Sequence, residues 1–327
     1  MPDPNLYRQL QDLGAGDALA LALKRFSGLV LGAYETKLVV VSHGVKQALV
    51  GAKEYQFPAT WKMTAEEHEP GTQLGGNKEP LSEERKIALD TKELVSHNWT
   101  PVIDQFIAHF STQRETAKQA ARAIARQLDS RGLRVLILGA RQSTRGPNNE
   151  FPAGNRLTSP RTAPATTAYP LSLTGSKNLQ NDLAEIAQKM DEKDVPREWG
   201  MRWAFLTPYL KRVLLLDKTL VSRDYQDPNT MLRRVVKEVE GFIVEETNLM
   251  PSTNVTTETN DNYNGDFSKT ACCCLGDETA IGRVYAEEIT AFGPEWYGDR
   301  RAWLIGAASF QGQKWLRPEA CAEIQMT

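Results

Sequence analysis

Residues 315–320 read Trp-Leu-Arg-Pro-Glu-Ala and stand close to the end of this 327-residue chain. The stretch joins two apolar runs, residues 303–310 and 320–324, which we expect to be β-strands. A turn over residues 312–318 would connect these strands. The stretch is not a catalytic motif, so we interpret it as a structural signature.

Two other segments accompany it at a distance in the sequence. Residues 16–24 read Gly-Asp-Ala-Leu-Ala-Leu-Ala-Leu-Lys, and Asp17 is a suitable N-cap for a helix over residues 18–33. Residues 56–58 read Gln-Phe-Pro and lie in a polar, glycine-spotted stretch, residues 42–84, that has no helical period. Two long strands of a hairpin fit this stretch, and an ordinary surface loop is the alternative.

The composition is that of an ordered globular protein. Hydrophobic residues make up 41% of the chain and charged residues 24%, with a formal net charge of −2. This near-balance argues against a protein that binds nucleic acid over its whole surface, but it leaves local basic faces open. The first 13 residues are not a signal peptide, and charged residues interrupt the longest apolar stretch, residues 19–41, so we expect no membrane span.

The four cysteines give no disulfide framework and no metal-binding spacing. Three are adjacent, Cys272, Cys273 and Cys274, and the fourth is Cys321. We expect them to be small buried side chains in a strand, in a protein made for a reducing cytoplasm.

The clearest predicted helix covers residues 112–128, and we expect Gly132 to end it. Its alanine-rich face would let another backbone approach closely. A basic stripe repeats every four residues on the other side: Arg114, Lys118, Arg122 and Arg126. The stripe fits a solvated helix face, ion pairs with acidic loops of a neighbouring molecule, or an electropositive surface facing DNA, and four residues do not separate these readings.

Residues 98–101 read Asn-Trp-Thr-Pro, and we expect them to break a strand over residues 85–96. Residues 133–138 read as a strand or a continuation of the helix, and residues 141–180 and 251–270 read as loops. The other expected elements are a helix over 179–191, a strand over 203–206, a helix from Pro208 to about 215, and strands over 241–245 and 271–275.

The search for chemistry finds no catalytic, cofactor-binding or metal-binding residues. Residues 139–146 lack the Gly-Lys-Ser/Thr ending of a phosphate-binding loop, and no nucleophile elbow is present. His68 lies among Glu66, Glu67 and Glu69, but a solvated acidic loop explains that cluster better than a metal site. We therefore expect no enzyme.

The three quoted segments, in this order and at these distances, resemble the major capsid protein of short-tailed phages of the autographivirus (podovirus) type. The resemblance implies an α+β subunit of the Hong Kong 97 type (HK97-like) capsid fold. It also implies an N-terminal arm over 1–41, an extended E-loop over 42–84, a discontinuous peripheral domain over 85–180 and 276–327 with a long spine helix, and an axial domain over 181–275. The E-loop would lie across a neighbouring subunit through Tyr55, Gln56, Phe57, Pro58 and Trp61, with its apolar residues buried only after assembly.

The function that the resemblance implies is a major capsid protein that assembles with copies of itself into pentamers and hexamers. These would form an icosahedral shell around double-stranded phage DNA, contacted without sequence specificity. Implied partners are a scaffolding protein and a portal at one vertex, with no membrane, and the location is the virion after assembly in the host cytoplasm. The alternatives are a minor head or decoration protein, or a cytoplasmic enzyme whose site escapes recognition.

Overall fold

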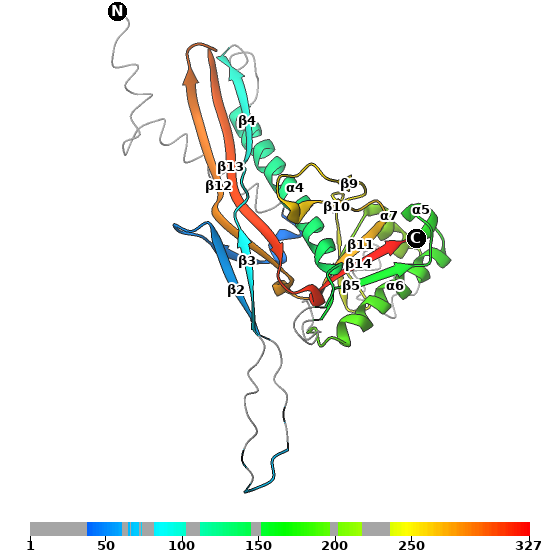
Figure 1. Ribbon diagram of the computed structural model, residues 1–327. Helices are drawn as coiled ribbons and strands as arrows, with labels where there is room; N and C mark the ends of the chain where they lie inside the picture. Colours follow the sequence, from blue (N-terminus) through cyan, green and yellow to red (C-terminus); the bar gives the residue numbers. More distant parts are fainter. Residues whose placement is uncertain are drawn as a thin grey trace, which may run out of the picture.

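The computed structural model describes residues 38–60, 65, 67–71, 73, 82–102, 112–144, 152–196, 202–217 and 236–327. The helix expected over residues 18–33 therefore lies outside the described residues. So does Trp61. Two sheets and a long helix organise the rest (Figure 1).

The first sheet has four strands in the order β1-β12-β13-β4. Its strands are β1 (Val45–Ala48), β12 (Ile281–Tyr297), β13 (Ala302–Trp315) and β4 (Leu94–Pro101). β1 runs parallel to β12, and the other pairs are antiparallel. Much of this sheet is a single long hairpin, β12–β13. The strand β13 extends beyond the apolar run 303–310 at both ends, and β12 was not predicted.

The predicted break at residues 98–101 is wrong, because β4 continues through Pro101. Pro101 pairs with Ala302 at the edge of the sheet. Proline is tolerated on an edge strand, where its missing N–H leaves no central ladder bond unmade. The predicted strand 85–96 is divided between β3 (Ser82–Ala88) and β4.

The spine helix is α4 (Thr112–Ala140), and it packs along the four-stranded sheet (Figure 1). Its alanine-rich face is buried as predicted, against Ile305 and Ala307 of β13. The expectation that Gly132 ends the helix is wrong. Residues 133–137 remain helical and are almost all fully buried, and that burial outweighs the roughly 1 kcal/mol that a glycine costs inside a helix.

The second sheet has six strands in the order β5-β14-β11-β6-β8-β7. They are β5 (Asn155–Ser159), β14 (Cys321–Met326), β11 (Thr270–Leu275), β6 (Trp203–Leu206), β8 (Phe242–Glu246) and β7 (Glu238–Val239). The helices α5 (Ala165–Ala168), α6 (Leu173–Asp191) and α7 (Pro208–Leu214) lie beside this sheet and form one lobe of the subunit with it (Figure 1). The four-stranded sheet and α4 form the other lobe. The strands predicted over 203–206, 241–245 and 271–275 are confirmed within a residue or two.

All four cysteines are free and fully buried in this sheet, as predicted. Burial raises the pKa of the Cys273 and Cys321 thiols well above the usual value, which keeps them protonated and inert.

The six-stranded sheet takes strands from both sides of the predicted limits of the axial domain. β5 and β14 come from the ranges 85–180 and 276–327, and α6 crosses residue 180. The division into peripheral and axial domains at those residues stays a prediction.

In the part of the chain that the structure describes, the smaller elements are two short strands, β9 (Asn254–Val255) and β10 (Gly265–Asp266), and four 3-10 turns. The turns are η1 (Val41–His43), η2 (Asp261–Tyr263), η3 (Glu278–Ala280) and η4 (Pro318–Ala320). No helix within the described ranges is both long and apolar enough to cross a membrane.

Candidate assembly surfaces

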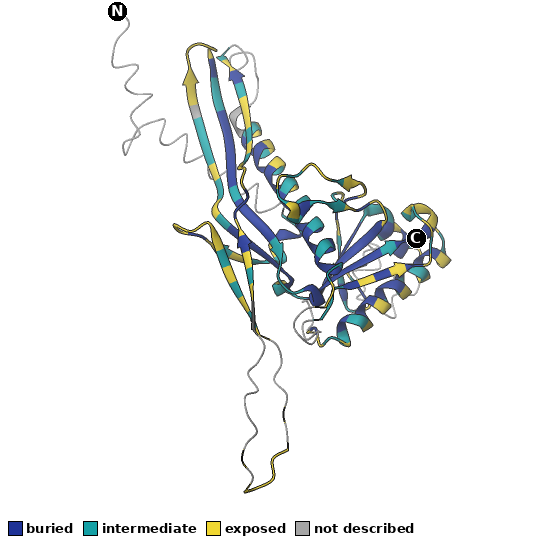
Figure 2. Ribbon diagram, in the orientation of Figure 1, coloured by how far each residue is buried: buried dark blue, intermediate teal, exposed yellow. Residues whose placement is uncertain are grey.

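The first candidate surface is the antiparallel pair of β2 (Glu54–Thr60) and β3, which projects from the body of the subunit (Figure 1). Along β2 the side chains alternate between half-buried and exposed, so one face of the pair meets the subunit and the other meets solvent (Figure 2). This confirms the hairpin reading of the polar stretch for the strands that the structure describes.

Tyr55 and Phe57 lie on the inner face of this pair. Their rings meet edge to face at 4.7 Å between centroids, and both pack on a small core that contains Ile87 and Val284. The expectation that these two aromatic residues are buried only after assembly is therefore wrong in part, because their own subunit already half-covers them.

Gln56 and Pro58 are exposed on the outer face. In the amide orientation that satisfies both neighbours, Gln56 donates to Glu84 at 3.3 Å and accepts from Lys86 Nζ at 3.2 Å. The outer face thus carries an acidic, an amide and a basic side chain side by side: Glu84, Gln56 and Lys86. A partner could bind this row through ion pairs and hydrogen bonds.

The base of the hairpin crosses β13 at Gly312. A Cβ atom at this position would stand 2.1 Å from the carbonyl oxygen of Ala88, the last residue of β3. The backbones can therefore meet only because residue 312 is a glycine.

The second candidate surface is the basic stripe on α4. Lys118 and Arg122 are half-buried and Arg126 is exposed, and none forms an ion pair with any residue that the structure describes. Arg114 belongs to the same helix, but its side chain lies outside the described part. The stripe therefore remains a candidate surface for a partner.

The basic residues further along α4 are different, because acidic residues of the same subunit neutralise them. Glu258, in the segment 251–270, accepts from Arg131 and Arg134, both at 2.9 Å. Burial opposes ionisation of Glu258, but the two guanidinium groups hold its pKa below the usual value. The loop-rich segment 251–270, which the sequence left without a role, is thus docked on the spine helix.

Asp90 extends this cluster to the end of the hairpin strand β3. It accepts from Arg131 at 3.0 Å, Asn260 at 2.7 Å and the Tyr263 hydroxyl at 3.1 Å. Burial raises the pKa of Asp90, and the bonds from Asn260 and Arg131 oppose that shift. The cluster fixes the hairpin base, the spine helix and the 251–270 segment to one another. The sequence could not predict it, because its residues come from segments that are far apart in the chain.

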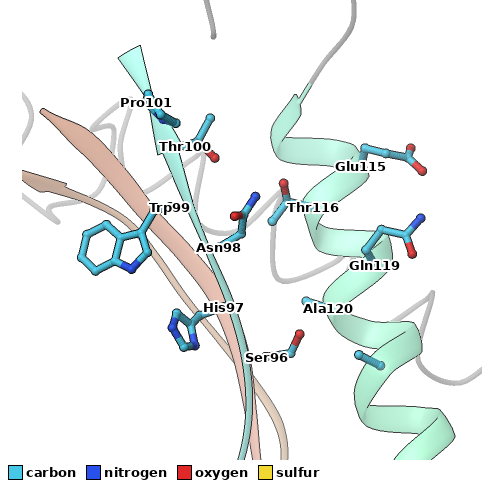
Figure 3. Close-up of a pocket in the computed structure, with 11 residues that line it drawn as sticks. Ser96, His97, Asn98, Trp99, Thr100, Pro101, Glu115, Thr116, Gln119 and Ala120 are labelled. Carbon is cyan, nitrogen blue, oxygen red and sulfur yellow. The ribbon is translucent and has the colours of Figure 1, made fainter. Parts of the chain in front are cut away.

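A groove of about 590 Å³ lies between β4 and the first turns of α4 (Figure 3). Asn98 and Thr100 point from the strand towards the helix, while His97 and Trp99 point to the opposite face of the sheet. The helix contributes the side chains of Glu115, Thr116 and Gln119 to the lining of the groove. The residues that line the groove contain no nucleophile paired with a base, and no group of three metal-ligating residues occurs in the described ranges.

The 315–320 stretch forms the joint between the two sheets, where the chain passes from β13 to β14. Leu316 donates its N–H to the Ala280 carbonyl at 2.8 Å, and Gly276 donates to the Ala320 carbonyl at 2.7 Å. The connection from β13 to β14 is therefore bonded at both ends to the connection from β11 to β12. The predicted turn is shorter than expected, because β13 runs to Trp315 and only η4 remains.

Solved structures with a similar fold include subunits of phage capsids. The chain superposes on a subunit of the capsid of Cyanophage P-SCSP1u with a TM-score of 0.74 and 23% identity, over 87% of this chain and 86% of that chain. A subunit of the bacteriophage PhiM1 mature capsid matches with a TM-score of 0.70 and 16% identity, over 89% and 87% of the two chains. The fold is therefore the Hong Kong 97 type capsid fold that the sequence predicted.

Sequence relatives agree with this result. The chain is 26% identical over 117 residues to the major capsid protein of Escherichia phage T7 and, over an equal length, to the minor capsid protein of that phage. The match spans 36% of this chain, but only 34% and 29% of these two relatives. The Gp10A-like family, described as major capsid protein, matches residues 56–280, which is more than half of the chain. Because the family model covers more than half of the chain, the chain belongs to the Gp10A-like family of major capsid proteins, which is structural and not enzymatic.

Proposed function

We propose that copies of this chain form pentamers and hexamers, and that these close into an icosahedral head around double-stranded phage DNA. A scaffolding protein guides assembly in the host cytoplasm, and a portal occupies one vertex. Contacts between copies are heterologous, so a surface on one subunit meets a different surface on the next, and rings close by rotation.

The projecting β2–β3 pair is the observation that carries this proposal. A two-stranded pair is marginally stable on its own, and the side chains along β2 are half-buried on one face only. A neighbouring subunit that covers the outer face, with Gln56 and Pro58, would offset the entropy lost on ordering it.

The first test is expression of the full chain, alone and together with a candidate scaffolding protein, followed by negative-stain electron microscopy. Shells, tubes or capsomer rings are the expected products. A well-folded monomer under both conditions would overturn the proposal.

A second candidate function is that of a minor capsid protein, because the chain is equally similar to that protein of phage T7. The number of copies per particle separates the two functions. Quantitative mass spectrometry of purified heads should find this chain as the most abundant protein if it builds the shell, and in a small fraction of the copies of the shell protein if it is a minor component.

The role of the E-loop residues is tested on the hairpin itself. Gln56→Ala together with Lys86→Ala removes the outer polar row and should lower the yield of shells while leaving the subunit folded. Phe57→Ala acts on the inner face, so it should lower both subunit stability and shell yield. Wild-type shell yield in both variants would exclude an assembly role for this pair of strands.

The role of the basic stripe is tested by removing its charge. The variant Lys118→Gln, Arg122→Gln, Arg126→Gln is compared with Arg156→Gln, Lys177→Gln, Lys269→Gln, which removes three exposed positive charges from the other lobe. Fewer empty shells in the first variant alone would assign the stripe to contacts between subunits. Normal empty shells that retain less DNA would assign it to the interior.

A further inference from the structure

The residues that lead into β1, Leu38–His43, form a segment that inserts into two separate hydrophobic cores. We call this the junction segment. Val39 and Val40 pack in the core of the six-stranded sheet, whereas Leu38 and Val41 pack in the core between α4 and the four-stranded sheet. Val40 and Val41 are 0% and 3% exposed, so the segment is an internal part of both lobes.

A single carboxylate organises the backbone of this segment. Asp129 Oδ2 accepts from the N–H of Val39 at 2.9 Å, and Oδ1 accepts from Val40 and Val41, both at 3.1 Å. Three successive N–H groups that converge on one anion form a nest, which is ordinarily an anion-binding shape. Asp129 lies on the spine helix and is only 1% exposed, so water cannot replace it as the acceptor.

The helix also makes room for the segment. A Cβ atom at Gly132 would stand 3.0 Å from a methyl carbon of Val41 and 3.5 Å from one of Val40. A glycine at position 132 costs helix propensity, but it leaves the space that Val40 and Val41 occupy. Asp129 and Gly132, three residues apart on α4, together form the surface on which the junction segment packs.

The far end of the segment is fastened to the six-stranded sheet. The His43 ring stacks on Trp203 of β6 at 4.3 Å between centroids, and its Nε2 lies 3.1 Å from Glu245 Oε1 of β8. Gly44 and β1 follow directly, and β1 joins the edge of the four-stranded sheet. The segment is therefore held by the helix, by one sheet and then by the other.

We propose that the Asp129 carboxylate is a latch on the junction segment, and that the latched segment fixes the angle between the two sheets. The consequence for shells rests on the proposed function. Subunits in which the angle between the two sheets varies should assemble into shells of variable curvature. The latch itself is a property of the single subunit and can be tested before assembly.

Two variants of the full chain open the latch in different ways. Asp129→Asn keeps the shape but turns an amide donor towards one of the three N–H donors. Gly132→Ala keeps the carboxylate, raises helix propensity and crowds Val41. The matched control is Asp182→Asn on α6, a buried aspartate whose hydrogen-bond partners in the described residues are Arg161 and Tyr169, which lie outside the segment and α4.

Hydrogen exchange measured by mass spectrometry on unassembled subunits is the first readout. Exchange in peptides covering residues 38–43 should accelerate at least about tenfold in both variants and not in the control. Unchanged exchange in both variants would overturn the latch.

Particle diameter measured by cryo-electron microscopy is the second readout. A broadened distribution of diameters is expected for both variants. Wild-type diameters despite accelerated exchange would overturn the link to the angle. If the wild-type chain forms no shells, the proposed function fails, and the exchange measurement still decides the latch.

Discussion

Arg317 and Asp277 lie on the two connections that run between the sheets, and the Arg317 guanidinium donates to the Asp277 carboxylate at 3.3 Å. The same guanidinium donates to Glu319 at 2.8 Å and to Thr279 at 3.2 Å. The arginine of the 315–320 stretch is thus the side chain that ties the joint together, which gives the sequence signature a physical meaning.

Replacing this arginine should loosen the joint. Arg317→Ala leaves the mostly buried Glu319 without its guanidinium partner, and we expect a loss of about 1–2 kcal/mol in the free energy of unfolding. Chemical denaturation measures it. Arg156→Ala, which removes an exposed arginine bonded to Gln325, is the control and should cost under about 0.5 kcal/mol. Equal effects of the two changes would mean that the joint does not depend on Arg317.

A buried ion pair in the six-stranded sheet should be far more sensitive. Glu323 is fully buried and accepts two bonds from Arg141, at 2.7 and 2.6 Å. The hydrogen bond that Arg141 donates to Glu323 also raises the pKa of Arg141, so the guanidinium stays charged. Glu323→Gln should cost about 3–5 kcal/mol, because a charge is left without its partner.

The paired replacement Glu323→Leu, Arg141→Met completes the test of that ion pair. It should cost clearly less than the sum of the single changes Glu323→Leu and Arg141→Met, because neither charge is then left without its partner. Additive losses in urea unfolding would show that the two residues act independently.

The crossing of the hairpin base over β13 should tolerate no side chain at Gly312. Gly312→Ala places a methyl group against the Ala88 carbonyl and should destabilise the subunit by about 1–3 kcal/mol through a forced backbone shift. Gly298→Ala is the matched control, because the nearest atom to its Cβ is Trp296 Nε1 at 3.8 Å. A thermal unfolding midpoint unchanged in Gly312→Ala would contradict the crossing.

Asp129 should make stability depend on pH. Burial raises the pKa of Asp129 from 3.8 to about 6, although the bonds from Val39–Val41 and the charge of Arg283 oppose the shift. Because the pKa is higher in the folded state, the stabilisation that protonation provides is complete below about pH 4. It is lost as the pH rises through about 6, by up to roughly 3 kcal/mol.

Unfolding curves recorded from pH 4 to pH 7 for the wild type and Asp129→Asn test this dependence. The free energy of the wild type should fall relative to that of the variant over this range. Parallel curves would show that the carboxylate titrates normally. Asp182→Asn again serves as the control.

Local patterns in the sequence determined a large part of the fold. The alanine face of the spine helix, the four cysteines in one buried sheet and the helix that begins at Pro208 follow from burial and backbone chemistry within a few residues. The family followed from three short segments in a fixed order. Such features can be predicted from the sequence because they depend on residues that are neighbours in the chain.

Tertiary structure decided where these elements end and what they hold. The helix passes Gly132 because the residues beyond it are buried in a core built from distant strands. β4 extends as far as Pro101 because it lies at a sheet edge. Glu258 meets Arg131, and Asp129 meets Val39–Val41, across 127 and about 90 residues of chain. The sequence alone determined some of the elements, but it missed β5 and α5, because residues 141–180 read as a loop. Only the folded chain decided these contacts, because their free energy depends on burial and on partners that no local pattern specifies.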